Sequence, residues 1–322
     1  MEYTYLGNTG LKISRIAFGC MSYGVAATGH HPWALDEDTA QPFYRQAAEL
    51  GITLWDTANV YSHGTSEEFM GRAIRRYSRR EDIVVATKLA GKMDDGPSGV
   101  GLSRKAVMEQ VDASLARLGT DYIDLYQIHR YDPNTPVEET MEALHDTVKA
   151  GKVRYLGASS MFAWQLAKLQ TAAVVHDWTP FVSMQDQYNL LKREEEREML
   201  PLCADLGMGV IPYSPQAKGR LTRPWGTETQ RTGNDPISPA FDSPLDEPIV
   251  HVVQAVAEAR GVSMATIAVA WLLRKPIVTA PIVGATKATH LADAVAALDI
   301  MLTDEEIEKL EASYVTQPAF WI

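Results

Sequence analysis

One pattern recurs along this chain: a segment with helical spacing ends at a glycine, and a short apolar run follows. It is found in AELGITLWD, ARLGTDYIDLYQIH, VKAGKVRYLGASS and ADLGMGVIPYS. Glycine is the usual left-handed residue after a helix C-terminus, and fully buried parallel strands read as continuous apolar runs. With four further runs, the expected strands are residues 13–19, 52–56, 83–88, 123–129, 153–159, 181–185, 210–213 and 278–283. Strands that alternate with helices predict an α/β fold, and eight such units predict a (β/α)8 TIM barrel.

The segments between these runs complete the predicted barrel. Helices are expected at residues 104–118, 136–150, 194–206, 264–274 and 289–298, with the charged run 192–198 as a solvated helix start. Residues 3–14 contain GNTG, which suits a hairpin turn, so they predict a β-hairpin cap on the barrel floor. A doubly wound sheet is the competing fold, but the G-x-G-x-x-G fingerprint that it normally carries does not occur. No linker or composition shift divides the chain, so residues 1–322 are expected to form a single domain.

Composition excludes several classes of partner. The formal charge is -11, and an acidic chain repels a phosphate backbone, so nucleic acid is not an expected partner. Two cysteines do not make a disulfide framework and indicate a reducing compartment. The start MEYTYLGNTG lacks the basic and apolar parts of a signal peptide, and no apolar stretch reaches the roughly 18 residues of a membrane helix. These features predict a cytoplasmic protein, and they leave its oligomeric state open.

Polar residues follow most of the expected strands at the point where each strand ends. Asp56, Lys88 and His129 end three consecutive strands, and Tyr61 lies five residues beyond Asp56. The following strands end at Ser159 and Ser160, at Gln185, and at Tyr213 and Ser214. The active site of a (β/α)8 barrel is built at this end of the strands.

Four of these residues suit acid catalysis on a carbonyl group. A tyrosine hydroxyl has an unperturbed pKa of about 10, and a neighbouring ammonium such as Lys88 lowers it. A buried ammonium needs a partner, which Asp56 supplies, and His129 is placed to bond a substrate oxygen. Taken singly, Asp56 and Lys88 also fit a structural ion pair, and His129 also fits a satisfied core histidine. His30 and His31 have no carboxylate or cysteine at ligand spacing, so no metal site is expected.

The segments that carry these residues resemble the aldo-keto reductase family. The resemblance rests on DTANVYSHGTSEEFMGRAI, the lysine of VVATKL, the histidine of DLYQIH, and the segments RYLGASS, MQDQYNLL and YSPQAKGRL. It covers essentially the whole chain, in order. The long-loop branch, which includes aryl-alcohol dehydrogenases and potassium-channel β-subunits, is the most similar.

The resemblance implies a barrel that binds NADPH without a Rossmann domain, and a catalytic tetrad of Asp56, Tyr61, Lys88 and His129. By position, the residues expected to contact the nicotinamide are Ser159, Ser160, Gln185 and Tyr213. Those expected along the pyrophosphate are Ser214, Gln216, Lys218, Gly219 and Arg220. Those expected at the 2′-phosphate and adenine are Gly284, Thr286, Lys287, His290 and Asp293.

Two positions depart from the family pattern. His290 stands where relatives often carry Arg or Gln, and Gln216 stands where Leu is common. Because histidine is mostly neutral at pH 7, the preference for NADPH is expected to rest on Lys287. The loops 23–33, 90–99 and 215–246 are expected to shape the pocket, with 215–246 as a lid. Trp33, Met93 and Trp225 fit either a place in the pocket lining or a role in packing alone.

The resulting prediction is an NADPH-dependent reductase of aldehydes, either aromatic or small aliphatic, that acts on a small-molecule carbonyl substrate. Two alternatives stay open at this stage. One is a regulatory binding module of the channel β-subunit kind, which keeps the fold and the coenzyme. The other is a phosphosugar-binding barrel without redox chemistry.

Overall fold

The computed structural model describes residues 1–28, 32–96, 99–227 and 243–317. Its main sheet has eight parallel strands in the order β10-β3-β4-β5-β6-β7-β8-β9. The backbone N–H groups of Thr279 and Ile282 donate to the carbonyls of Val210 and Pro212, each at 2.8 Å, which joins the two edges of the sheet. The predicted (β/α)8 barrel is therefore confirmed. The strands are β3 (Ala17–Gly19), β4 (Leu54–Asp56), β5 (Val84–Leu89), β6 (Ile123–Ile128), β7 (Val153–Ser159), β8 (Phe181–Gln185), β9 (Gly209–Val210) and β10 (Ile282–Gly284).

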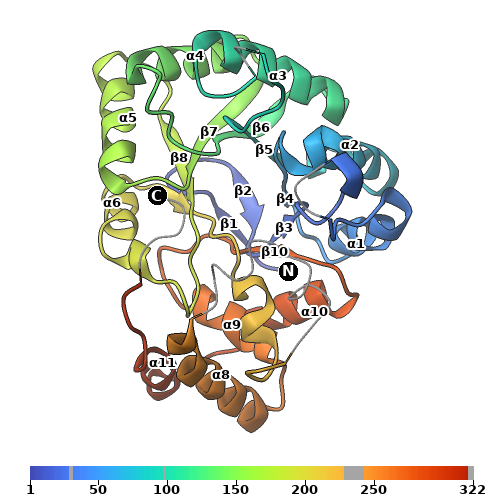
Figure 1. The fold of residues 1–322 in the computed structure, drawn as a ribbon, viewed down its shortest axis with the longest axis vertical. Helices are drawn as coiled ribbons and strands as arrows, with labels where there is room; N and C mark the ends of the chain where they lie inside the picture. The colour runs from blue at the N-terminus through green and yellow to red at the C-terminus, as the bar shows by residue number, and fades with distance from the viewer. Residues whose placement is uncertain (29–31, 97–98, 228–242, 318–322) are drawn as a thin grey trace.

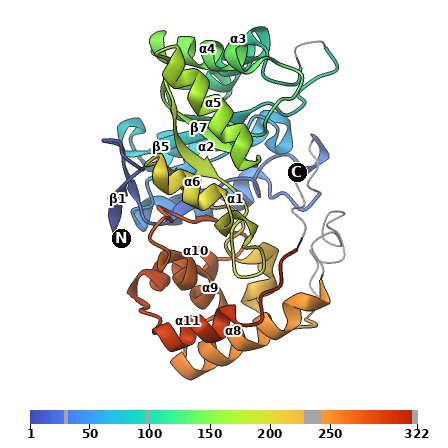
Figure 2. The same cartoon turned by 90° about the vertical axis from the view of Figure 1, so that its left-hand side faces the viewer.

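Helices surround the strands in Figure 1. They are α1 (Glu37–Glu49), α2 (Thr65–Tyr77), α3 (Arg104–Leu118), α4 (Val137–Lys149), α5 (Ala163–Val175), α6 (Met199–Asp205), α8 (Glu247–Arg260), α9 (Met264–Leu273), α10 (Thr289–Ala296) and α11 (Asp304–Glu311). Helices α8 and α11 pack outside α9 and form an extra layer (Figures 1 and 2). No single described helix is long and apolar enough to cross a membrane. Helix α8 with its preceding turn reaches the necessary length and apolar character only when it is counted together with α9, and a bend of 100° separates the two.

The predicted N-terminal hairpin closes one end of the barrel. Strands β1 (Tyr3–Tyr5) and β2 (Lys12–Ser14) pair antiparallel and lie at the left edge of the side view in Figure 2. Leu6 and Ile13 are fully buried, and they pack with Leu54, Val84 and other residues of the barrel interior. Leu54 and Val84 begin their strands, so the hairpin caps the end opposite to the predicted active site.

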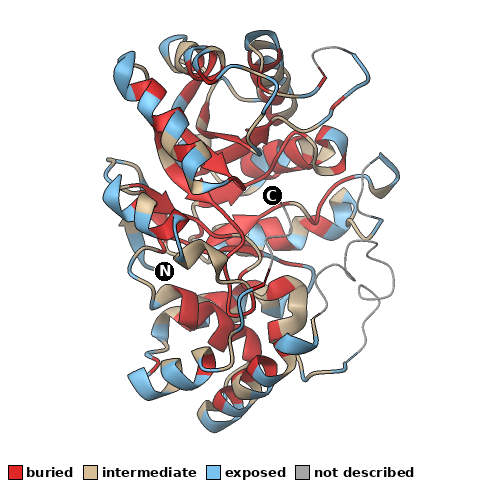
Figure 3. Ribbon diagram, turned by 60° about the vertical axis from the view of Figure 1, so that its left-hand side comes forward, coloured by how far each residue is buried: buried red, intermediate tan, exposed pale blue. Residues whose placement is uncertain are grey.

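A second, larger apolar core lies between the strands and the surrounding helices. Figure 3 shows buried residues on the inward faces of the helices and exposed residues on their outer faces. Helix α9 is the exception, because nine of its ten residues are buried. Its position between the barrel and the outer layer of α8 and α11 accounts for that burial.

Four expected strands are shorter than their apolar runs. Of the runs 52–56 and 210–213, only Leu54–Asp56 and, at the second, Gly209–Val210 form regular strand. Residues 13–19 divide between β2 and β3, because Ser14 exchanges hydrogen bonds with Thr53 through both side chains, at 2.9 Å, instead of pairing with a strand on that side. Residues 278–283 form a regular strand only from Ile282. Pro281 precedes it, and proline has no N–H to donate to a ladder.

The expected helix 194–206 is also divided. A short 3-10 turn covers Glu194–Glu196, Glu198 leaves the helical region with φ −136°, and α6 begins at Met199. The acidic run is not a solvated helix face, because Glu194 accepts hydrogen bonds from the Tyr314 hydroxyl and the Gln317 backbone at 2.7 and 3.0 Å. These bonds hold the acidic run against the C-terminal segment, so the run does not continue into α6 as one helix.

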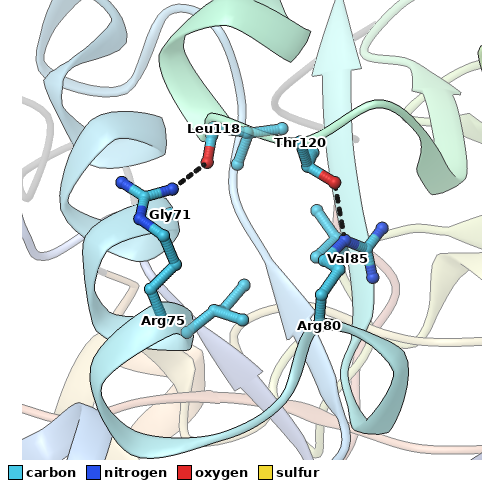
Figure 4. Close-up of a pocket in the computed structure, with 7 residues that line it drawn as sticks. Gly71, Arg75, Arg80, Val85, Leu118 and Thr120 are labelled. Carbon is cyan, nitrogen blue, oxygen red and sulfur yellow. Dashed lines mark hydrogen bonds between the residues drawn. The ribbon is translucent and has the colours of Figure 1, made fainter.

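Helices α2 and α3 approach very closely at one glycine. A Cβ atom on Gly71 would lie 2.0 Å from the carbonyl oxygen of Leu118, a contact that only glycine avoids. Arg75 donates to the same carbonyl at 3.2 Å, and Arg80 donates to Thr120 at 2.9 Å, around a small cavity of about 30 Å³ (Figure 4). This packing fixes the position of α2, the helix that follows the Tyr61 loop.

Candidate active site

Three of the four predicted tetrad residues are in direct contact. The Lys88 ammonium at the end of β5 donates to Asp56 Oδ1 at 2.5 Å and to the Thr57 carbonyl at 2.9 Å, and it lies 3.3 Å from the Tyr61 hydroxyl. The Lys88 side chain is 0% exposed. His129, which follows β6, meets the Tyr61 ring edge-on, with the ring centroids 5.7 Å apart. The four side chains therefore form one cluster at the carboxyl ends of β4, β5 and β6.

The second oxygen of Asp56 is held by two amides from further around the barrel. The Nε2 atoms of Gln127 and Gln185 lie 3.0 and 2.9 Å from Asp56 Oδ2. Gln185 Nε2 also lies 3.2 Å from Gln127 Oε1. We did not predict the part played by Gln127 from the sequence, although a polar residue inside an apolar strand was a signal available there.

The loop that carries Tyr61 has an unusual backbone. Ser62 and His63 adopt left-handed conformations with φ 46° and 53°, and Gly64 follows at φ 90°. The left-handed backbone conformation is energetically unfavourable for residues other than glycine, and residues strained in this way are found most often at functional sites. The hydroxyls of Thr28 and Thr65 bond the Ser62 carbonyl at 3.0 and 2.8 Å, which holds the turn in place.

The electrostatics of the cluster keep a proton on Tyr61. Burial raises the pKa of Tyr61 above its usual value, and the Lys88 charge lowers it only part of the way back. The predicted effect of Lys88 on this pKa therefore has the expected direction, but burial of the tyrosine outweighs it. Burial by itself would lower the pKa of Lys88, but Asp56 and Tyr61 together raise it. Burial, with Lys88 and Arg130, lowers the pKa of His129 well below its usual range, so its imidazole is neutral at pH 7.

The residues predicted around the nicotinamide also lie together. Ser159 Oγ donates to the Gln185 carbonyl at 2.7 Å, and Ser160 Oγ lies 3.4 Å from the Tyr213 hydroxyl. Ser160 is left-handed, with φ 48°. Its backbone N–H donates to Asp186 Oδ1 at 2.8 Å, a contact that the strand-end pattern of the sequence does not predict.

Asp186 is a buried acid with one unused oxygen. The residue is 2% exposed, and its Oδ2 has no hydrogen-bond partner among the described residues. Burial, and then the nearby charge of Glu195, raises the pKa of Asp186 well above its usual range. Burial and Glu194 raise the pKa of Glu195 to about 7. The folded protein therefore binds a proton at Asp186 that the unfolded chain releases above about pH 4, and stability falls as pH rises from there.

We expect Asp186→Asn to stabilise the protein at neutral pH. The amide still accepts from the Ser160 N–H but never ionises, so the gain should be about 1–3 kcal/mol at pH 7 and should shrink toward zero near pH 4. Urea unfolding at pH 4 to 8 measures it. Asp132→Asn is the control: although burial opposes it, the bonds from Thr135 and Asn134 lower the pKa of Asp132, so this variant should lose stability at neutral pH. An Asp186→Asn curve parallel to that of the wild type would contradict the assignment.

The residues predicted along the pyrophosphate form one tight turn after β9. Ser214, Lys218 and Gly219 are left-handed, with φ 53°, 55° and 93°, and the Asn189 amide donates to the Ser214 carbonyl at 2.9 Å. Gln216 Nε2 is buried and has no acceptor within the described parts of the chain. Arg220 lies 3.9 Å from Asp246, which offsets part of its charge. An unused buried donor beside two cations fits a ligand with phosphate oxygens.

The residues predicted at the 2′-phosphate lie between β10 and α10. Gly284 ends β10, and Asp293 lies within α10. The backbone N–H of His290 donates to the backbone carbonyl of Lys287 at 3.1 Å. The Thr286 N–H donates to His290 Nδ1 at 3.3 Å. Lys287 is exposed, and no carboxylate of the described residues forms an ion pair with it.

The expected pocket loops are described only in part. His30, His31, residues 97–98 and residues 228–242 of the expected lid lie outside the described residues. Met93 is buried at 8% exposure, with its N–H bonded to the Gly99 carbonyl at 2.7 Å, and Trp225 packs against the larger core. Both side chains therefore contribute to packing in the described part of the chain.

Comparison with known proteins finds relatives along nearly the whole chain. Residues 15–315 match the aldo/keto reductase family. The chain is 44% identical to versiconal hemiacetal acetate reductase of Aspergillus parasiticus, over 98% of this chain and 97% of that protein. It is 43% identical to a protein of Schizosaccharomyces pombe named for an aryl-alcohol dehydrogenase activity, over 98% and 96% of the two chains. A similarly named protein of Saccharomyces cerevisiae is 42% identical, over 97% and 96%.

Proposed function

The chain belongs to the aldo/keto reductase family of oxidoreductases, and we propose that it reduces aldehydes to alcohols with NADPH. The observation that carries the proposal is the position of the Lys88 ammonium, which contacts both Asp56 and the Tyr61 hydroxyl. A protonated tyrosine beside a fixed cation suits donation of a proton to a developing alkoxide. The tetrad thus has the parts of a general acid, whose contribution to rate is typically about 10²–10⁴-fold.

Each tetrad residue has a separate task in this proposal. Tyr61 donates its proton to the carbonyl oxygen, and Lys88 stabilises the phenolate that remains. Asp56 keeps Lys88 charged and in place, with Gln127 and Gln185 holding its other oxygen. Neutral His129 bonds the substrate oxygen and orients it toward Tyr61. The coenzyme supplies the hydride for the carbonyl carbon.

The coenzyme would lie along the ends of β7 to β10. Ser159, Ser160 and Gln185 would hold the nicotinamide amide, and Tyr213 would lie against its ring. Because Gln185 Nε2 is already committed to Asp56, only its oxygen remains to accept from that amide. Ser214, Gln216, Lys218, Gly219 and Arg220 would follow the pyrophosphate, and the orphaned Gln216 donor supports this placement. Gly284, Thr286, Lys287, His290 and Asp293 would meet the adenosine end.

The names of the relatives favour aromatic substrates over small aliphatic ones, since two of them are named for aryl-alcohol chemistry. The test is a panel of aromatic and aliphatic aldehydes with NADPH, followed by loss of nicotinamide absorbance. Turnover of aromatic aldehydes supports the proposal. Tight NADPH binding with no turnover of any carbonyl would contradict it and would favour the regulatory alternative.

Coenzyme choice is expected to depend on Lys287. A 2′-phosphate carries about two negative charges near pH 7 by analogy with other phosphomonoesters, and Lys287 is an exposed cation with no described ion-pair partner. Lys287→Ala should weaken NADPH binding by about 1–3 kcal/mol while sparing NADH. Fluorescence titration gives Kd for both coenzymes. His290→Gln is the control for the pH dependence. In the wild type we expect the preference for NADPH to strengthen from pH 8 to 6, and this variant should lose that trend. Equal losses of affinity for both coenzymes in Lys287→Ala would show that Lys287 does not contact the 2′-phosphate.

A further inference from the structure

We propose that Tyr131, Phe162 and Trp164 form an aromatic rim that binds the planar aromatic part of the carbonyl substrate and so selects extended aryl aldehydes. This inference rests on the proposed function and adds to it a specificity surface outside the tetrad. The three residues belong to the loops and helix start that follow two neighbouring strands, and none of them is used by the chemistry described above.

Topology places the rim at the same end of the barrel as the tetrad. Tyr131 lies two residues after His129, in the loop that follows β6. Phe162 and Trp164 lie two and four residues after Ser160, where α5 begins at Ala163 beyond β7. Strands β6 and β7 are hydrogen-bonded neighbours. The rim and the tetrad therefore lie at the carboxyl ends of adjacent strands, on the face of the barrel that a substrate must approach to reach Tyr61.

The rings touch one another but are open to solvent. Trp164 is the central ring: its centroid is 6.0 Å from that of Tyr131, at 61°, and 6.5 Å from that of Phe162, at 18°. Trp164 is 57% exposed and Phe162 is 44% exposed. A contiguous group of exposed aromatic rings is unusual on a protein surface and marks a binding site more often than an isolated ring does.

The rim is held in place without being covered. The Phe162 N–H donates to Gln165 Oε1 at 2.9 Å, which fixes the first turn of α5, and Tyr131 packs against the larger core. An aromatic ligand would thus add to rings that are already ordered, and so lose little side-chain entropy on binding. Aromatic pairs prefer offset-stacked or edge-to-face contact, and the Trp164 ring has one close neighbour of each kind.

The size of the rim favours a small planar ligand over a second protein. Each aromatic side chain offers about 150–250 Å² when fully buried, and these three are already partly covered. The remaining area is well below the roughly 800 Å² per partner of a stable protein interface. A ring system of two fused rings matches the area that these side chains leave open.

The test compares two aldehydes that differ in the part that would reach the rim. We expect Trp164→Ala to lower kcat/KM for 2-naphthaldehyde about threefold to tenfold, mainly through KM, the scale of one aromatic contact. For propanal, which has no aromatic ring to contact Trp164, kcat/KM of the same variant should stay within about twofold of the wild-type value. Trp164→Phe should restore most of the loss. Tyr5→Ala is the matched control, because Tyr5 is 58% exposed on the hairpin at the opposite end of the barrel.

Several outcomes would overturn the inference. Equal losses for both aldehydes would show that Trp164 acts through structure, and unchanged kinetics for 2-naphthaldehyde would show that the rim does not touch substrate. A change in oligomeric state in Trp164→Ala, seen by light scattering, would make the rim an interface between copies of the chain. A wild-type protein that reduces neither aldehyde contradicts the proposed function as well, whereas one that reduces both with the ratio unchanged in Trp164→Ala contradicts the rim alone.

Discussion

Replacing Tyr61 with Phe is expected to lower kcat for aldehyde reduction by about 10²-fold or more, the usual contribution of a general acid. The ring stays in place against His129, but the hydroxyl that lies 3.3 Å from Lys88 is gone. NADPH affinity should change little, because the hydroxyl faces the substrate in the proposed chemistry. Steady-state kinetics and a coenzyme titration on the same preparation measure both quantities.

The control for this experiment is a hydroxyl outside the tetrad. Tyr126 is a fully buried tyrosine on β6 whose hydroxyl has no hydrogen-bond partner among the described residues. Tyr126→Phe should keep near-normal kcat, since it removes a hydroxyl of the same kind without touching Lys88. A Tyr61→Phe enzyme that turns over as fast as Tyr126→Phe would remove Tyr61 from the mechanism.

Lys88→Met is expected to abolish activity and to destabilise the fold. The substitution deletes a fully buried ammonium and leaves Asp56 charged inside the barrel. Breaking a buried pair by removing one partner typically costs about 3–5 kcal/mol. The amides of Gln127 and Gln185 still bond Asp56 Oδ2, so we expect a folded but weakened protein. Urea unfolding and single-turnover kinetics measure the two effects.

A double variant separates charge from chemistry. In Lys88→Met with Asp56→Asn, no uncompensated charge remains in the barrel, so part of the stability should return. Activity should not return, because the cation beside Tyr61 is still missing. If Lys88→Met alone turned over at the wild-type rate, Lys88 would have no part in the proposed reaction.

The fold was predictable wherever a local rule applied without competition. Strand β7 and strand β8 have the bounds that their apolar runs predict. Helix α3 runs from Arg104 to Leu118 as predicted, because Ser103 caps its start and left-handed Gly119 ends it. The predicted element bounds were wrong where contacts between residues distant in sequence determine the local structure. Ser14 bonds Thr53 on the side where a further strand would otherwise pair, and Glu194 bonds residues some 120 positions away.

The site shows the same division. Strand ends and spacing predict that Asp56, Tyr61 and Lys88 converge, because the parallel strands that carry them are neighbours. They do not predict that Gln127 and Gln185 share one oxygen of Asp56, since this depends on which side chains point inward at the same height. Nor do they predict the bond between Asp186 and the Ser160 N–H, which joins adjacent strand ends only in this register.

The complete burial of Lys88 determines how the site recovers its proton. Lys88 has no exposed surface, and both oxygens of Asp56 are occupied by donors, so neither group exchanges protons directly with solvent. Tyr61 is the member of the trio that is only partly buried. Under the proposed chemistry, the phenolate left after each reduction is reprotonated at its own oxygen, from the space that the substrate has just occupied. The alcohol product then leaves, and the proton returns to Tyr61, through the same opening. The enzyme is therefore ready for a new turnover only after the product has left.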